Sequence, residues 1–266
     1  MMELAAIVSH LPPTYPWHDA VTLVKSIDST NDALKRLAVQ GAPEGTALIA
    51  ECQTRGKGRR GRSFCSPAGL GIYMSVLLRP HCPAGQLLHL TPAIGEAICD
   101  AVERSTDIRP NIKWANDLVI ERRKICGILV EPHIDALGNV ESAVCGIGIN
   151  CCQRAEDFPP ELRETAASLA MFTPQVNQNR LAAEMLAAMR QISETVLREK
   201  CAWMRRYRAD CMTIGQEISL VRGNQIRHGT ALDVDDDGAL LVRYTGGETE
   251  AVCSGEVSVR GMYGYV

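Results

Sequence analysis

The sequence predicts an α+β protein in which a mixed β-sheet with helices is followed by a small all-β unit. Apolar runs of strand length alternate with longer runs of helical period over most of the chain. From Met212 onward only short strand-like runs remain, separated by the turn signals Asp236-Asp237-Gly238 and Gly246-Gly247. We therefore expect a large domain over residues 1–212 and a small β-barrel domain over residues 213–266.

Each element of the large domain has a local signal. Ser29-Thr30-Asn31 supplies an N-cap for a helix that runs to about Gln40. Apolar residues recur at a period near 3.6 between Gln86 and Arg104, which predicts a second helix. A long amphipathic helix is expected over residues 179–207, and the proline-rich first 20 residues are expected to form an irregular lead-in. The expected strands cover residues 21–27, 46–51, 71–78, 112–114, 118–121, 125–131 and 140–149, and in the small domain residues 217–221, 227–234, 240–244, 250–253 and 257–260.

Composition limits the class of protein. With 266 residues, 46% hydrophobic content and a net charge of −3, the chain reads as an ordinary globular protein, and its overall charge gives no reason to expect nucleic acid. Its 11 cysteines are odd in number and form no Cys-x-x-Cys pair, which argues against a disulfide framework or a zinc site. We expect most of them to be buried in a protein of the reducing cytoplasm. The sequence shows neither a signal peptide nor an apolar run near the roughly 18 residues of a membrane span, so we expect no membrane partner.

A glycine-punctuated basic loop, Thr54–Arg62, is the most unusual segment. Its cations and glycines are Arg55, Gly56, Lys57, Gly58, Arg59, Arg60, Gly61 and Arg62. Part of it matches the literal G-x-G-x-x-G dinucleotide pattern, which requires a following helix and an acidic residue about 20 positions later. A strand is expected next instead, and no Asp or Glu lies between Glu51 and Glu96. The dinucleotide interpretation therefore fails.

Such a loop suits an anionic ligand. Glycines allow backbone N–H groups to approach a phosphate, and arginine and lysine neutralise its oxygens. Because the cations repel one another, we expect the loop to be mobile when empty and to order over its ligand. Taken alone, the loop leaves two alternatives open, a solvated surface loop and a nucleic-acid contact.

A second polar cluster interrupts the strand-rich region. Lys113-Trp114-Ala115-Asn116-Asp117-Leu118 is unusual there because buried polar groups need partners, and Lys124 then opens the apolar run Lys124–Glu131. Taken alone, the first segment is also compatible with a structural Asn-Asp turn in a hairpin. Lys124 is likewise compatible with an edge residue of no chemical role.

Taken in order, these motifs resemble those of the biotin–protein ligase family. The resemblance is carried by Ser29-Thr30-Asn31, Glu51-x-Gln53, Gly56–Arg62, Lys113–Leu118, Lys124–Glu131 and Gly146-Ile147-Gly148-Ile149-Asn150. It implies a catalytic domain like that of class II aminoacyl-tRNA synthetases, followed by an SH3-like barrel. It also implies the type without an N-terminal DNA-binding domain, because only about 20 residues precede the first expected strand, too few for a helix-turn-helix domain.

The resemblance implies a two-step reaction. Biotin and ATP would condense to biotinyl-5′-AMP and pyrophosphate, with Mg²⁺, and the biotinyl group would pass to one lysine of an acceptor. The expected acceptor is a biotin carboxyl carrier domain such as that of acetyl-CoA carboxylase. Cations suit the first step, since two anions must be brought together and charge then moves to pyrophosphate.

The resemblance also assigns residues. Biotin would contact Ser29, Thr30, Asn31, Gln53, Gly56, Lys57, Gly58, Arg59, Lys124, Gly127 and Gly146. ATP and the adenylate would contact Arg59, Arg62, Phe64, Asn116, Lys124 and Asn150. The catalytic residues would be Lys124, Arg59 and Asp117, with Asp117 accepting a proton from the acceptor lysine. It assigns no protein ligand to the metal, and Mg²⁺ would arrive on the substrate phosphates.

The chain departs from the family pattern at two positions, and two rival functions remain. Ala115 stands where the family usually has proline, and Lys57 stands where many members have arginine. Lysine keeps the charge but lacks the planar fork, so contacts there are expected to be looser. The rivals are a lipoate- or octanoate-type protein ligase and a biotin-responsive DNA-binding regulator, and the short N-terminus disfavours the second. Pairing with a second copy through edge strands near Val140–Ile149 is left open.

Overall fold

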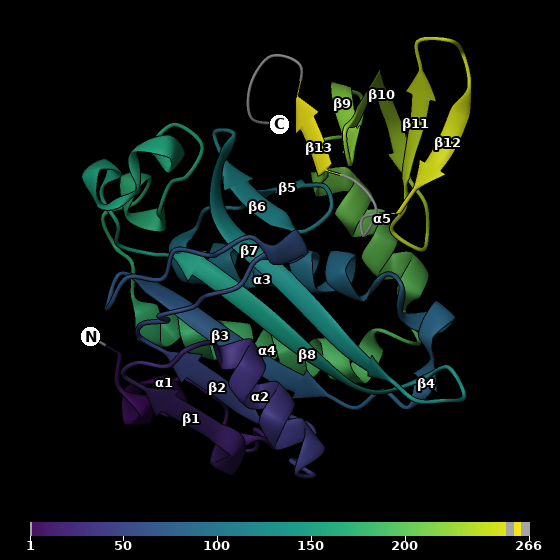
Figure 1. Ribbon diagram of the computed structural model, residues 1–266. Helices are drawn as coiled ribbons and strands as arrows, with labels where there is room; N and C mark the ends of the chain where they lie inside the picture. The colour runs from purple at the N-terminus through teal and green to yellow at the C-terminus, as the bar shows by residue number, and fades with distance from the viewer. Residues whose placement is uncertain (1, 254–257, 262–266) are drawn as a thin grey trace.

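The computed structural model describes residues 2–253 and 258–261, and its largest element is a mixed eight-stranded sheet. The strands follow the order β1-β2-β3-β8-β7-β6-β5, with β4 paired to β8 beyond the end of β3 (Figure 1). Only the pair β1 and β2 is parallel, which confirms the mixed sheet predicted from the sequence. The edge expected near Val140–Ile149 was wrong, because β8 pairs with β3 and β4 on one side and with β7 on the other. The bounds are β1 Val21–Val24, β2 Ala47–Ala50, β3 Gly71–Leu78, β4 Cys82–Pro83, β5 Asn111–Lys113, β6 Asp117–Ile120, β7 Arg123–Ile134 and β8 Asn139–Asn150.

Helices cover both faces of this sheet (Figure 1). The helices are α1 Leu4–Ser9, α2 Thr30–Val39, α3 Leu90–Thr106, α4 Gln178–Thr195 and α5 Lys200–Asp210. Alternate residues of β3, including Met74 and Val76, lie in the main core with α3 and α4. Leu77, which points the other way, packs with Leu34 of α2 in a separate small cluster. The polar pocket described below lies on the α2 side of the sheet.

Two helical expectations were wrong. The lead-in contains α1, because Ile7 is fully buried and the segment packs on α4, where the Tyr15 hydroxyl donates to the Leu186 carbonyl at 3.0 Å. The single helix expected over residues 179–207 is two helices that break between Thr195 and Lys200. Buried His89 contacts the Val196 carbonyl through Nε2 at 2.8 Å, so a distant element uses a group that an unbroken helix would have bonded.

Other boundaries moved by a few residues. The strand expected to reach Ile27 ends at Val24, and the helix expected from Gln86 begins at Leu90 after a 3₁₀ turn. The 3₁₀ turns are His18–Ala20, Arg59–Gly61, Ala84–Leu87, Ala155–Asp157, Pro160–Leu162 and Leu169–Met171. Six of the 11 cysteines are buried, as the composition predicted for most of them. Among the described residues, no helix has both the length and the apolarity needed to cross a membrane.

The C-terminal part is a five-stranded antiparallel sheet, as the turn signals predicted. Its strands follow the order β12-β11-β10-β9-β13. The bounds are β9 Glu217–Arg222, β10 Gln225–Val234, β11 Leu240–Tyr244, β12 Thr249–Val252 and β13 Ser258–Gly261. Val257, the expected start of the last strand, lies outside the described residues. The SH3-like closure of this sheet stays a prediction.

Candidate functional site

A polar pocket opens over the central strands, between α2, the basic loop and the β5–β6 connection. Its hollow measures about 470 Å³ including the open space at its mouth. Twelve residues singled out from the sequence line it: Ser29, Thr30, Asn31, Gln53, Lys57, Gly58, Arg59, Phe64, Asn116, Lys124, Gly127 and Gly146. Segments spread over more than 100 residues of sequence therefore meet at one place.

One end of the pocket is a neutral hydrogen-bonding surface at the start of α2. Ser29 caps the helix, and its side chain accepts from the Asp32 amide at 3.4 Å. The Gln53 Oε1 accepts from both the amide and the hydroxyl of Thr30, at 2.9 and 3.1 Å. The Gln53 Nε2 donates to Ser66 at 3.0 Å. These contacts fix the orientation of the Gln53 amide and present several donors and acceptors of no net charge.

Asn31 is buried beside that surface and is held from three sides. Its Nδ2 donates to Glu131 Oε2 at 2.8 Å and to the Leu129 carbonyl at 3.3 Å, while Oδ1 accepts from Ser75 at 2.6 Å. A Cβ at Gly146 would lie only 2.1 Å from Asn31 Oδ1. The expectation was that Gly146 leaves room for biotin, but the closest atoms that require glycine here belong to Asn31.

The basic loop reaches across the pocket and is anchored at two points. Lys57 Nζ lies 2.7 Å from Asp32 Oδ1 on α2. Arg59 Nη1 donates to Asn116 Oδ1 at 2.8 Å, on the β5–β6 connection. Burial lowers the pKa of the Arg59 guanidinium, and nearby Asp117 opposes that shift. Since an arginine stays protonated even so, a half-buried cation faces the hollow.

The other end of the pocket is charged. Lys124 Nζ lies 2.7 Å from Asp117 Oδ1 and 5.8 Å from the centre of the Phe64 ring. A Cβ at Gly127 would lie 2.9 Å from Lys124 Nζ, and one at Gly148 would lie 2.6 Å from the Phe64 ring. The two glycines therefore let the lysine and the ring lie flat against the sheet.

The backbone around Lys124 and Asn116 is also fixed. Lys124 bonds through its amide and carbonyl to Thr165 and Ala167, at 2.8 and 2.9 Å. Asn116 Nδ2 donates to the Ile128 carbonyl at 2.9 Å, and the Trp114–Ala115 peptide before it is cis. The Ile128 amide also donates to the Asn116 carbonyl at 3.0 Å, so both segments are held by main-chain bonds.

Four predicted residues do not line the pocket. Asp117 pairs with Lys124 at 2.7 Å. Gly56 packs against the Phe64 carbonyl, from which a Cβ would lie only 2.4 Å away. Arg62 is exposed on the loop. The Asn150 amide bonds to the Ala167 carbonyl at 3.0 Å and accepts from Gln153 at 3.2 Å, so its side chain supports the neighbouring segment. Their ligand contacts stay predictions.

Sequence reasoning missed several residues of the site. The lining residues not singled out are Tyr73, Met74, Ile128, Leu129, Ile147 and Gly148. They belong to the central strands. Tyr73 and Met74 had indicated only a strand, and the other four lie in the motifs Lys124–Glu131 and Gly146–Asn150 but had been given no contact of their own. It also missed Asp32 and Glu131 as acids that hold Lys57 and Asn31. No sequence pattern pairs these acids with residues 25 to 100 positions away.

The two ends suit one kind of ligand. The neutral end offers fixed donors and acceptors to an uncharged polar head group, and the charged end offers Arg59 and Lys124 to an anion. The strand residues between them supply apolar wall. A molecule with an amide-like head, an apolar chain and a carboxylate or phosphate fits this order of environments.

Comparison with known proteins identifies the family of this chain. Residues 23–150 match the Biotin/lipoate A/B protein ligase family, and residues 213–260 match the Biotin protein ligase C terminal domain. The Biotin--[acetyl-CoA-carboxylase] ligase of Mycobacterium tuberculosis is 32% identical over 247 residues, covering 88% of this chain and 87% of that protein. The chain belongs to the biotin protein ligase family. It is therefore an enzyme of the ligase class.

Two further relatives were compared with this chain, one by sequence and one by structure. The Bifunctional ligase/repressor BirA of Bacillus subtilis is 34% identical over 232 residues, covering 81% of this chain and 67% of that protein. The biotin protein ligase of Aquifex aeolicus, solved in complex with biotin and ATP, superposes with a TM-score of 0.72 at 27% identity, covering 91% of this chain and 98% of that one.

Proposed function

We propose that this enzyme joins biotin to AMP and then transfers the biotinyl group to a lysine of an acceptor protein. The observation that carries the proposal is the order of environments in one hollow: fixed neutral groups at Thr30 and Gln53, apolar strand residues, and cations at Arg59 and Lys124. Biotin has the same order of parts, a cyclic urea, an apolar body and a carboxylate. The lipoate-type alternative is less favoured, because lipoate has no group that would use the donors and acceptors of the neutral end.

In the proposed arrangement each end of the pocket has its own task. Ser29, Thr30 and Gln53 bind the urea, and Asn31 supports them from below. Arg59 and Lys124 bind the carboxylate and the α-phosphate, while Lys57 and Gly58 cover the acyl chain. Phe64 packs on the adenine from its place over the sheet. Positioning two anions for in-line attack is the larger part of the catalytic task, and a cation between them lowers their repulsion.

The first step forms one bond and breaks one. A biotin carboxylate oxygen attacks the α-phosphorus of ATP, and the bond to the bridging oxygen breaks as pyrophosphate leaves with the electron pair. In the second step the acceptor amine attacks the acyl carbon, and AMP leaves. The amine must lose a proton, and Asp117 is its proposed acceptor because it lies at the charged end, where the acyl carbon would be; its carboxylate is 2.7 Å from Lys124.

Mg²⁺ is proposed to enter with ATP. Within the described residues, no group of three or more His, Cys, Asp and Glu side chains could hold a metal ion. The acid at the charged end, Asp117, is paired with Lys124. The chain thus offers a magnesium ion few ligands of its own, and the ion commonly binds through substrate phosphates and waters. No chemical step is assigned to a metal held by this chain.

We also propose the wider setting. A biotin carboxyl carrier domain is the proposed acceptor, as the name of the M. tuberculosis relative indicates for that protein. The proposed domain boundary remains near residue 212, and the cytoplasm remains the proposed location. A DNA-binding role and a homodimer are not part of the proposal.

The test is direct reconstitution. Incubation with biotin, Mg-ATP and a carrier domain should give biotinylated lysine and biotin-dependent pyrophosphate release. Lys124→Ala should lower the rate of adenylate formation by at least about 100-fold, as expected for loss of a cation at the reacting charge. Absence of both products from the wild-type protein would refute the proposal. Product from lipoate in place of biotin would favour the alternative ligase.

A further inference from the structure

The charged end of the pocket is held from outside by distant parts of the chain. Asn116 and Asp117 contact Arg59 and Lys124, so their positions matter for the proposed chemistry. They follow directly on Lys113-Trp114-Ala115, and this short segment has its own set of buried contacts. Those contacts come from residues 207–238, more than 90 positions later in the sequence.

The first set of contacts comes from the end of α5. The Met212 amide donates to the Ile112 carbonyl at 2.9 Å, and the Trp114 amide donates to the Thr213 hydroxyl at 3.0 Å. The Tyr207 hydroxyl donates to the Ala115 carbonyl at 3.3 Å. Thr213 and Tyr207 are completely buried. The link between α5 and β9 therefore lies alongside the segment like an additional short strand.

The second contact comes from the C-terminal sheet itself. The indole Nε1 of Trp114 donates to the Gly238 carbonyl at 2.9 Å, and the Trp114 side chain is only 5% exposed. Gly238 lies in the β10–β11 turn with φ of +84°, and a Cβ there would lie 2.9 Å from Pro92 Cγ. A carbonyl of this turn thus accepts the hydrogen bond of the buried indole.

The turn that provides this carbonyl is itself firmly held. The Asp235 carboxylate accepts from the amides of Asp237 and Ala239, at 2.9 and 2.8 Å. Lys200 pairs with Asp237, and Arg208 contacts Asp236. The turn is therefore tied both internally and to α5.

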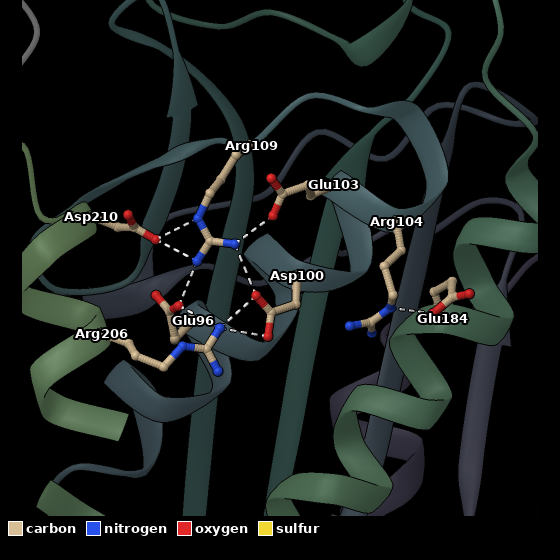
Figure 2. A network of polar contacts seen from close by, with 8 residues as sticks. All are labelled: Glu96, Asp100, Glu103, Arg104, Arg109, Glu184, Arg206 and Asp210. Carbon is tan, nitrogen blue, oxygen red and sulfur yellow. Dashed lines mark hydrogen bonds and ion pairs between the residues drawn. The ribbon is translucent and has the colours of Figure 1, made fainter. Parts of the chain in front are cut away.

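A network of ion pairs connects α5 to α3 and to the residues before β5 (Figure 2). Arg109, two residues before β5, contacts Asp210 at the end of α5 at 2.5 and 2.8 Å. It also contacts Asp100 and the fully buried Glu96 of α3, at 2.9 and 2.5 Å. Arg206 of α5 binds the same two acids. The residues just before β5 and the end of α5 are thus connected through one guanidinium.

We propose that the Asp235–Ala239 turn of the C-terminal sheet is a positioning element for the reaction. Its Gly238 carbonyl orients Trp114 and thereby Asn116 and Asp117, although no described residue of β9–β13 lines the pocket. Displacement of the turn by a few tenths of an ångström moves the two polar residues relative to Lys124 and Arg59. Small misplacements of this kind lower catalytic rates strongly while leaving remote binding contacts intact.

The inference rests on the proposed function and predicts a split between rate and binding. Gly238→Ala places a Cβ against Pro92 in a backbone conformation that favours glycine. The rate of biotinyl-AMP formation at saturating substrates should fall about 10-fold. The biotin dissociation constant, measured by calorimetry without ATP, should change less than about 2-fold, because Thr30 and Gln53 have no contact with the turn.

A matched control lies in the next turn. Gly247 also has positive φ, +87°, in the β11–β12 turn of the same sheet, but a Cβ there would meet no atom within 4 Å. Gly247→Ala therefore carries the backbone strain without a contact like the one between Gly238 and Pro92. It should keep the wild-type rate. Equal losses in both variants would overturn the proposal, since they would show a general effect of weakening the sheet.

A second variant tests the link itself. Trp114→Phe keeps an aromatic ring but removes the N–H that reaches Gly238. It should lower the rate, and Gly238→Ala added to it should cost little more, because the same connection is already broken. Fully additive losses would overturn the proposal, and if Gly238→Ala does not fold, a wild-type rate in Trp114→Phe would overturn it alone. An inactive wild-type protein would instead be a failure of the proposed function.

Discussion

Gly146→Ala should damage the pocket through Asn31. Gly146 lies in β8, paired with Ser75 of β3 on one side and Leu129 of β7 on the other, so its backbone cannot withdraw without moving the centre of the sheet. The new Cβ would lie 2.1 Å from Asn31 Oδ1 and 2.8 Å from its Cγ, where real Cβ atoms stay beyond 3.0 Å. The asparagine amide must therefore move by about 1 Å or more to restore ordinary contact.

The cost can be worked out from the bonds that this movement breaks. Asn31 has contacts to Ser75 at 2.6 Å, to Glu131 at 2.8 Å and to the Leu129 carbonyl at 3.3 Å. At about 1 kcal/mol each, the loss of two or three of them predicts a decrease of about 2–3 kcal/mol in the free energy of unfolding. Biotin affinity should fall as well, since Asn31 lines the pocket beside Thr30.

The assay is a double-mutant cycle in urea. Gly146→Ala, Asn31→Ala and the double variant are unfolded in parallel, with Gly85→Ala as control because a Cβ at Gly85 meets no atom within 4 Å. If the clash with Asn31 is the cause, Gly146→Ala should cost less than about 1 kcal/mol in the Asn31→Ala background. An equal cost in both backgrounds would refute this reasoning, as would a stable single variant.

Three further predictions follow from named contacts. Asp117→Asn should slow transfer from preformed adenylate to the acceptor lysine by at least about 100-fold, and transfer at the wild-type rate in a single-turnover assay would exclude it as the base. Asp32→Asn removes the partner of the half-exposed Lys57, so stability in urea should change by less than about 1 kcal/mol while release of free biotinyl-AMP rises about 2- to 5-fold; unchanged release would show that the pair does not hold the loop. Burial raises the pKa of Glu96 to about 7 from 4.5, helped by the charge of Asp210 and opposed by Arg109. The unfolded chain therefore loses this proton first, and stability falls as pH rises from about 4.5 to 7, so Glu96→Gln should gain up to about 3 kcal/mol relative to wild type between those pH values; a pH-independent difference in urea unfolding would contradict it.

Most of the fold could be predicted because its signals are local. The strand expected over 71–78 matches β3, and the one expected over 240–244 matches β11. Ser29 was expected to cap a helix and does so. Alternation, capping residues and glycine turns depend only on neighbours in sequence, so the elements that they determine can be predicted from the sequence. The break between α4 and α5 depends instead on His89, more than 100 residues away, and no local signal marks it.

The candidate site shows the same division. Its motif residues could be selected from the sequence, and twelve of them meet in one hollow. The contacts that each residue makes in the fold could not be predicted, because they depend on partners that the sheet brings together. Gly146 illustrates the difference: its glycine could be selected as part of a motif, but the need for it comes from Asn31 in α2. Selection of residues and assignment of their tasks are therefore separate problems.

Lys57 lies at one end of a series of ion pairs. The sequence indicated looser contacts there because lysine replaces a planar guanidinium with a point charge. In the structure that point charge is met by Asp32, which also contacts Lys35, and Lys35 binds Glu131, the acid that holds Asn31. A chain of alternating charges thus connects the basic loop to the support beneath the neutral end of the pocket. Each exposed pair contributes little to the free energy of unfolding. Lys57 is therefore expected to matter because it attaches the basic loop to this series of ion pairs. We therefore expect Asp32→Asn to weaken the attachment of the basic loop over the pocket while the fold stays intact.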